Sequence, residues 1–240
     1  MPRLCIGTSG FSFGGWKGNF YADGVREKDM LAAYSKTFNS VEINNSFYRM
    51  PTPAAIEKWV ATVPSGFIFS YKANRLITHQ TTLKDPELIE RQSANVGSFG
   101  ERLGPILFQL PPYFKANVER LKTFVSALPD INRYTFEFRD QSWLCEDVYT
   151  VLRDHNIALC FCNFKDLQPS ETPTADFVYL RMHGMNVEDS GSYSDGVLTE
   201  YAEKIKGWQK QGLDVFCYFD NEHKVCAPLD AQVLQKKLQE

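Results

Sequence analysis

Residues 177–183 read Phe-Val-Tyr-Leu-Arg-Met-His, and residues 214–219 read Asp-Val-Phe-Cys-Tyr-Phe. Aromatic and β-branched residues dominate both runs, which predicts two β-strands. Between them, apolar residues recur at helical spacing and stop at Gly212, which is typical of an amphipathic helix with a C-terminal glycine. These apolar residues are Leu198, Tyr201, Ile205 and Trp208. A strand, a helix and another strand in succession indicate a parallel sheet.

The same alternation of strand and helix repeats along the chain. Eight strands are expected, at Leu4–Ser9, Ser40–Asn44, Phe67–Lys72, Pro105–Leu110, Tyr134–Arg139, Ile157–Cys162, Phe177–His183 and Asp214–Phe219. The 240 residues divided by eight give 30 residues per unit, which is close to the spacing of a (β/α)8 barrel. We therefore expect an α/β fold in which residues 1–240 form a single TIM-barrel-like domain. An open doubly wound sheet is the alternative, but its usual Gly-x-Gly-x-x-Gly turn does not follow the first strand.

Two connections between strands carry distinctive signals. Asp85 followed by Pro86 marks the start of the third helix. The apolar face expected for this helix consists of Leu88, Ile89, Val96, Phe99 and Leu103. Residues 163–176 contain Pro169 and Pro173 and are too short and too interrupted for a full helix, so we expect an irregular crossover between strands six and seven.

Composition excludes several classes of protein. Hydrophobic residues make up 43% and charged residues 23% of the chain, which is ordinary for a globular protein. The formal net charge of −3 does not favour nucleic acid as the main partner. Because no apolar run has the length of a signal peptide or a membrane span, we expect a cytoplasmic protein with no membrane contact. Its six cysteines then are reduced thiols.

Polar side chains occur near the carboxyl end of nearly every predicted strand. Side chains at positions i and i+2 of a strand share a face, so the residues opposite the apolar ones point into the barrel. The polar residues expected at this end are Ser9, Glu42, Asn44, Lys72, Gln109, Glu137, Arg139, Arg181, His183, Tyr218 and Asp220. The carboxyl end of the strands is where α/β barrels carry their chemistry. The alternative is a set of structural ion pairs, for example between Glu42 and Arg181.

In this set, three cationic side chains, Lys72, Arg139 and Arg181, outnumber the two clear carboxylates, Glu42 and Glu137. Surplus positive charge in a cleft favours an anionic ligand with a phosphate or carboxylate group. We expect the catalytic residues to be Glu42, Glu137, Lys72 and His183. The expected substrate-binding residues are Ser9, Asn44, His79, Gln109, Arg139, Arg181, Trp16, Tyr48, Trp143, Asp220 and Asn221.

Histidines offer an alternative chemistry at the same end. His79 follows the third strand and His183 ends the seventh, so either can act as a general acid or base. Together with Glu42 and Glu137 they also form a conceivable metal site. No His-x-His or His-Glu-x-x-His spacing is present, so no metal and no organic cofactor are expected. The aromatic residues on these loops either line a pocket or pack over the end of the barrel.

At these residues the chain resembles the domain-of-unknown-function 72 family, also called YecE-like. The matching stretches are Gly7–Phe11, Trp16, Phe20-Tyr21, Phe38–Tyr48, Lys72, Thr78-His79, Leu103–Pro112, Glu137–Arg139, Trp143 and Tyr179–Gly184. The resemblance implies a TIM-barrel-like fold and no particular reaction. Two positions depart from the family pattern, because Asn163 stands where the family often has Asp, and Asp220-Asn221 where it often has two Asn. If a carboxylate after strand six has an acid–base role in relatives, that role is either absent from this chain or performed by Asp220.

Three functions remain open. The first is an enzyme of hydrolase or lyase type that acts on a small anionic substrate, with Lys72, Arg139 and Arg181 holding the anion and Glu42 or Glu137 as general base. The second is a metal-assisted phosphoesterase. The third is a non-catalytic binding module for a nucleotide, a nucleic-acid end or a protein partner. The sequence does not determine the oligomeric state.

Overall fold

The computed structural model describes the chain except for residues 1, 163–166, 168–169, 185–190 and 222–224. The described residues form eight strands that alternate with helices. The strands are β1 (Leu4–Thr8), β2 (Ser40–Ile43), β3 (Ile68–Lys72), β4 (Leu103–Gln109), β5 (Tyr134–Glu137), β6 (Ala158–Cys162), β7 (Phe177–Met182) and β8 (Asp214–Phe219). The α-helices are α1 (Met30–Tyr34), α2 (Pro53–Thr62), α3 (Pro86–Val96), α4 (Val118–Ser126), α5 (Glu146–Asp154), α6 (Asp195–Lys210) and α7 (Cys226–Gln239).

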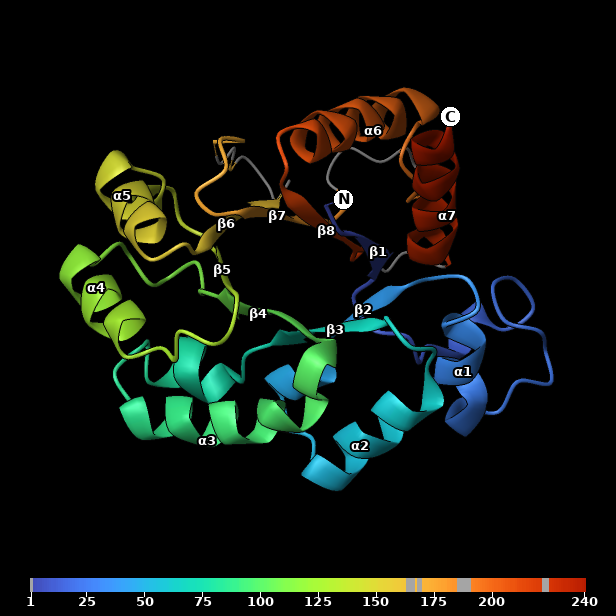
Figure 1. Ribbon diagram of the computed structural model, residues 1–240, viewed down its shortest axis with the longest axis horizontal. Helices are drawn as coiled ribbons and strands as arrows, with labels where there is room; N and C mark the ends of the chain where they lie inside the picture. Colours follow the sequence, from blue (N-terminus) through green and yellow to red (C-terminus); the bar gives the residue numbers. More distant parts are fainter. Residues whose placement is uncertain (1, 163–166, 168–169, 185–190, 222–224) are drawn as a thin grey trace.

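All eight strands run parallel in one sheet, in the order β1-β8-β7-β6-β5-β4-β3-β2. Figure 1 shows the strands around a common centre with the helices outside them. The two ends of the sheet meet where Ser9 forms a parallel bridge with Glu42. This contact makes the sheet a nearly closed barrel, which confirms the TIM-barrel-like fold and excludes the open sheet.

The seam between β1 and β2 depends on a glycine and a tyrosine. The hydroxyl of Tyr34 accepts a hydrogen bond from the backbone N–H of Thr8 at 2.8 Å and donates one to the carbonyl of Ser40 at 3.0 Å. A β-carbon at position 7 would lie 2.0 Å from that carbonyl oxygen. Only glycine fits at Gly7, because neither neighbouring backbone has room for a side chain.

Two apolar layers surround the sheet. The larger one lies between the barrel and its helices. The smaller one fills the barrel interior and includes Cys5, Ile68, Leu107, Cys160, Phe177 and Phe216. Above it, the hydroxyl of Tyr218 contacts those of Ser40 and Ser70, at 2.5 and 2.8 Å. The interior therefore becomes polar towards the carboxyl ends of the strands, where the charged residues follow.

The predicted elements agree with the structure apart from a few boundaries. Asp85 caps α3 as predicted, since its side chain accepts from the backbone N–H of Glu87. Leu103 does not belong to the helix face, because Gly100 has a φ of 54° that ends the helical path and Leu103 begins β4. Of residues 163–176, the described ones contain no helix, and the remainder, including Asn163, lies outside the described residues. In the described part of the chain, no helix is long and apolar enough to cross a membrane.

Candidate functional site

Arg181, at the end of β7, is the centre of a group of charges at the carboxyl ends of the strands. Its guanidinium donates to Glu42 of β2 at 2.8 Å, to Glu137 of β5 at 2.7 Å and to Asp220, which follows β8, at 2.7 Å. The side chains of Arg181, Glu42 and Glu137 are fully buried. We call these three residues the buried charge network. Since isolated buried ions cost several kcal/mol each, the network requires this mutual pairing.

Further bonds fix the two glutamates of the network. Glu42 also accepts hydrogen bonds from the hydroxyls of Ser9 at 2.5 Å and Tyr179 at 2.7 Å. Glu137 accepts one from Gln109 at 3.0 Å and forms an ion pair with Arg139. The pKa of Glu137 lies well below its usual value because Arg181, Arg139 and His183 together outweigh the opposing effect of burial.

His183 lies at the outer edge of the buried charge network. Its Nδ1 is 3.1 Å from Asp220, and its Nε2 is 3.3 Å from Glu137 and 3.0 Å from Arg139. Burial disfavours the imidazolium, but Glu137 and Asp220 have the larger effect and raise the pKa of His183 above its ordinary value. Burial likewise opposes ionisation of Asp220, yet Arg181 and His183 lower its pKa to about 2. An acceptor therefore faces each nitrogen of the imidazole, and arginine donors also face Nε2, which suits a group that gains and loses a proton.

Lys72 ends β3 on the same interior face as Ser70 and is 7% exposed. Its ammonium nitrogen lies 4.7 Å from the centre of the Phe47 ring. The His79 ring packs edge-on against the same phenyl ring, 4.9 Å between centres. Burial and the positive charge of Arg181 lower the pKa of Lys72, while burial and Lys72 lower that of His79. These contacts place Lys72 and His79 on the same side of the site, around the Phe47 ring.

A cavity of about 240 Å³ opens beside Ser9 and Asp220. Phe13, Gly14, Gly15, Trp16, Phe219 and Ala227 complete its lining. Oδ1 of Asp220 is buried and has no hydrogen-bond partner among the residues the structure describes. The cavity is therefore lined by a residue whose second carboxylate oxygen is unpaired among the described residues.

Four of the predicted substrate-binding residues lie in other surroundings. Trp143 is fully buried, stacks on Phe138 with 4.9 Å between ring centres, and donates its indole N–H to a backbone carbonyl. Asn221 donates its amide to Asp230 of α7 at 2.7 Å. These contacts give both residues a packing or positioning role, and the expectation that they contact substrate stays a prediction. Tyr48 is 69% exposed, and Asn44 begins the short turn Asn45–Phe47.

Tyr179 is a residue of the site that sequence reasoning missed. It lies two positions before Arg181 on β7, and its hydroxyl holds Glu42. The i, i+2 rule that selected Arg181 and His183 also selects Tyr179, but an aromatic residue in an apolar strand does not stand out as polar. Its fully buried hydroxyl is a partner of the glutamate and does not face the cavity.

The geometry argues against the alternative of a metal site. Glu42 and Glu137 both direct their oxygens at guanidinium groups, and His79 contacts Phe47 and Thr78. Within the described residues, no group of three or more His, Cys, Asp or Glu side chains is arranged to hold a metal ion. Arg181 thus occupies the place between the carboxylates that a cation would take.

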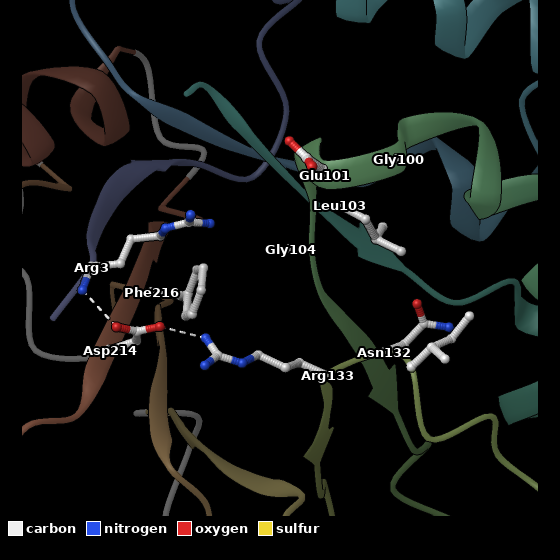
Figure 2. Close-up of a pocket in the computed structure, with 10 residues that line it drawn as sticks. Arg3, Gly100, Glu101, Leu103, Gly104, Asn132, Arg133, Asp214 and Phe216 are labelled. Carbon is white, nitrogen blue, oxygen red and sulfur yellow. Dashed lines mark hydrogen bonds and ion pairs between the residues drawn. The ribbon is translucent and has the colours of Figure 1, made fainter. Parts of the chain in front are cut away.

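A second cavity, of about 550 Å³, lies at the opposite end of the barrel (Figure 2). Its charged groups come from the amino ends of strands, where Asp214 accepts from the backbone N–H of Arg3 and pairs with Arg133. The side chain of Arg133 is 38% exposed, so the ion pair is partly hydrated and contributes little to stability. In α/β barrels this end serves stability, and loops for chemistry extend from the other end. We therefore place the candidate site at the carboxyl end.

Comparison with known proteins identifies the family to which the chain belongs. The model of the family described as "Protein of unknown function DUF72" matches residues 5–240. The chain belongs to this family. A DUF72 relative, the UPF0759 protein YunF of Bacillus subtilis, is 26% identical over 91% of this chain and 88% of its own length. The UPF0759 protein YecE of Escherichia coli K12 is 29% identical over 45% of this chain and 41% of its own length.

Solved structures of DUF72 proteins share the fold. A DUF72 family protein from Thermotoga maritima superimposes with a TM-score of 0.89 at 28% identity, covering 99% of this chain and all of the other. A DUF72 protein from Enterococcus faecalis superimposes with a TM-score of 0.83 at 19% identity, covering 99% and 96% of the two chains. The resemblance seen in the sequence is thus confirmed. None of these names states an activity, so the function is inferred from the residues of the site.

Proposed function

We propose that this protein is an enzyme of hydrolase or lyase type that acts on a small anionic substrate at the carboxyl end of the barrel. The observation that carries the proposal is the buried, unpaired ammonium of Lys72. Among the described residues, no ion pair or hydrogen bond engages its Nζ, although Glu42, Glu137 and Asp220 contribute to its electrostatic environment. A phosphate or carboxylate group would supply the missing counter-charge.

The proposed roles divide between an inner and an outer set of residues. Arg181, Glu42 and Glu137 are fully buried and bonded to one another, so we assign them a positioning role. Sequence reasoning assigned substrate contact to Arg181 and base catalysis to Glu42 or Glu137. Full burial and complete pairing favour a positioning role for all three residues. If one of them left its ion pair to react, the opposite charge would remain buried and unpaired.

The outer set consists of Lys72, Arg139, His183 and Asp220. We assign Lys72 and Arg139 to anion binding, where charge-assisted hydrogen bonds would hold the substrate and any developing oxyanion. His183 is the proposed general acid or base, and Asp220 and Glu137 set its pKa and hold its ring. Ser9, Gln109 and His79 border this set and complete the proposed substrate pocket with Trp16.

The test measures anion binding first. Titration calorimetry with inorganic phosphate compares the wild type with Lys72→Met and Arg139→Met. Loss of one charge-assisted hydrogen bond, worth about 1.5–3 kcal/mol, weakens binding roughly tenfold or more. Arg133→Met, which changes the opposite end of the barrel, is the matched control and leaves binding unchanged.

Turnover is tested next with a panel of phosphate- and carboxylate-bearing metabolites, using mass spectrometry to detect products. Product formation that His183→Gln abolishes supports the enzyme. Phosphate binding that Lys72→Met and Arg139→Met leave intact would refute the site. Binding without any product across the panel would refute the enzyme and favour a binding module.

A further inference from the structure

Lys72 differs from the other lysines that the structure describes in its burial, because it is 7% exposed whereas the others lie at least partly in solvent. At the surface, Lys115, Lys122 and the partly buried Lys206 each have a carboxylate partner within 3.4 Å. Lys204 has two, Glu171 and Glu200, both at 2.8 Å. The buried Lys72 makes no ion pair with any described residue, although burial of an unpaired ammonium is costly.

The carboxylates near Lys72 are already engaged by other groups. Glu42 is held by Arg181, Ser9 and Tyr179. Oδ2 of Asp220 is held by Arg181 and His183, while its Oδ1 has no partner among the described residues. Arg181 therefore pairs with both carboxylates, and the amine of Lys72 lies close to a phenyl ring. Low polarity and a neighbouring cation are the two conditions that activate a lysine as a nucleophile.

We propose that the amine of Lys72 forms a Schiff base with its substrate, and that the substrate is a small anion carrying an aldehyde or ketone group. This inference rests on the proposed function, since the outer cations would hold the anionic group while the amine meets the carbonyl. It narrows the reaction to a lyase that breaks a bond next to the carbonyl carbon. Arg139 is the proposed anchor for the phosphate or carboxylate.

The step balances without an oxidant or a metal. The lone pair of the neutral amine attacks the carbonyl carbon, the π electrons move to the oxygen, and that oxygen takes up a proton. The resulting carbinolamine takes up a proton, loses its hydroxyl group as water and leaves an iminium ion. The positive nitrogen then accepts the electron pair of a bond broken at the adjacent carbon, which gives an enamine, and the fragment that gave up the pair leaves as carbon dioxide or an aldehyde. A proton adds to the enamine carbon, and water hydrolyses the regenerated iminium to the product and the free amine.

His79 is the group that we assign to the proton transfers. His79 contacts the same Phe47 ring as Lys72, and its lowered pKa keeps the imidazole neutral and able to accept a proton near neutral pH. Burial and Arg181 likewise lower the pKa of Lys72, while Glu42, Glu137 and Asp220 oppose that change. The balance of these groups sets the fraction of neutral amine.

The test traps the imine chemically. The wild-type protein is incubated with pyruvate or glycolaldehyde phosphate and reduced with sodium cyanoborohydride. Peptide mapping by mass spectrometry then locates the secondary amine, whose mass is that of protein plus probe, minus water, plus two hydrogens. We expect Lys72 to be modified at least tenfold more than any other lysine, and more by the charged probes than by acetone.

Matched variants separate the amine from the charge. Lys72→Arg keeps a cation but has no nucleophilic amine, and we expect it to lose the adduct while thermal melting shows a folded protein. Lys204→Arg removes a paired, partly exposed lysine and leaves the adduct at Lys72 unchanged. Even spread of the label over many lysines would overturn the proposal.

The same measurements distinguish this inference from the proposed function. If Lys72→Met weakens phosphate binding and the wild type forms no adduct at Lys72, the Schiff base is refuted and anion binding stands. If the adduct forms at Lys72 while Arg139→Met leaves phosphate binding intact, the nucleophilic amine is supported and the anion-binding role of Arg139 fails.

Discussion

Replacement of Arg181 by Leu tests whether the buried charge network stabilises the fold. The variant removes the guanidinium that faces Glu42, Glu137 and Asp220. Glu137 keeps Arg139, and Asp220 keeps His183, but Glu42 has no other ion-pair partner among the described residues. Breaking a buried pair from one side costs about 3–5 kcal/mol. For a chain of this size, each kcal/mol lowers Tm by roughly 2–4 °C, so we expect a fall of roughly 6–20 °C.

Urea unfolding followed by circular dichroism measures the free energy directly. Adding Glu42→Gln to Arg181→Leu removes the stranded charge, so the double variant should recover at least about 1 kcal/mol. Arg133→Leu is the control, because its ion pair with Asp214 is partly exposed and should cost less than about 1 kcal/mol. The reasoning fails if Arg181→Leu costs no more than this control, or if Glu42→Gln deepens the loss.

Three other outcomes follow from single contacts. The pKa of Asp220 is lowered to about 2, so the stabilisation of the fold by its carboxylate is present above pH 4 and lost as the pH falls to 2. Asp220→Asn should therefore lower the free energy of unfolding by about 2 kcal/mol at pH 7. A difference in stability from the wild type that persists at pH 2 would contradict this. Gly7→Ala places a β-carbon against the carbonyl of Ser40 and should lower the free energy of unfolding, measured with urea, by at least about 3 kcal/mol. Gly14 has open space around it, so the control Gly14→Ala should change that free energy by no more than about 0.5 kcal/mol. Trp143→Phe should lower stability by about 1–3 kcal/mol and leave phosphate titration unchanged, since a weaker affinity would return Trp143 to the binding site.

The strands could be predicted because their local pattern and their tertiary role coincide. Phe177–Met182 is apolar throughout except for Arg181, and β7 ends one residue before the predicted boundary at His183. Leu103 shows where local pattern fails. It continues the helical spacing of α3, but a positive φ at Gly100 turns the chain and makes Leu103 the first residue of β4. A backbone angle of this kind has no periodic signal in the sequence.

The charged residues of the site could also be predicted, but their pairing could not. Alternation along each strand placed Glu42, Glu137 and Arg181 on the interior face, and the structure has all three there. The roles proposed for these residues depend on their exposure, because Arg181 is fully buried whereas Lys72 is 7% exposed. Trp143 shows the same limit, because an aromatic residue on a loop has the same sequence signal whether it stacks on Phe138 or faces solvent.

Sequence by itself determined the parallel eight-stranded barrel and the end of it that carries the charges, because strand periodicity and chain order are local properties. Only the tertiary structure decided that Arg181 takes up the nearby carboxylates and leaves the ammonium of Lys72 without one. That outcome depends on distances between residues of β2, β3, β5 and β7 and the residue that follows β8, and electrostatic pairing is governed by such distances and by burial.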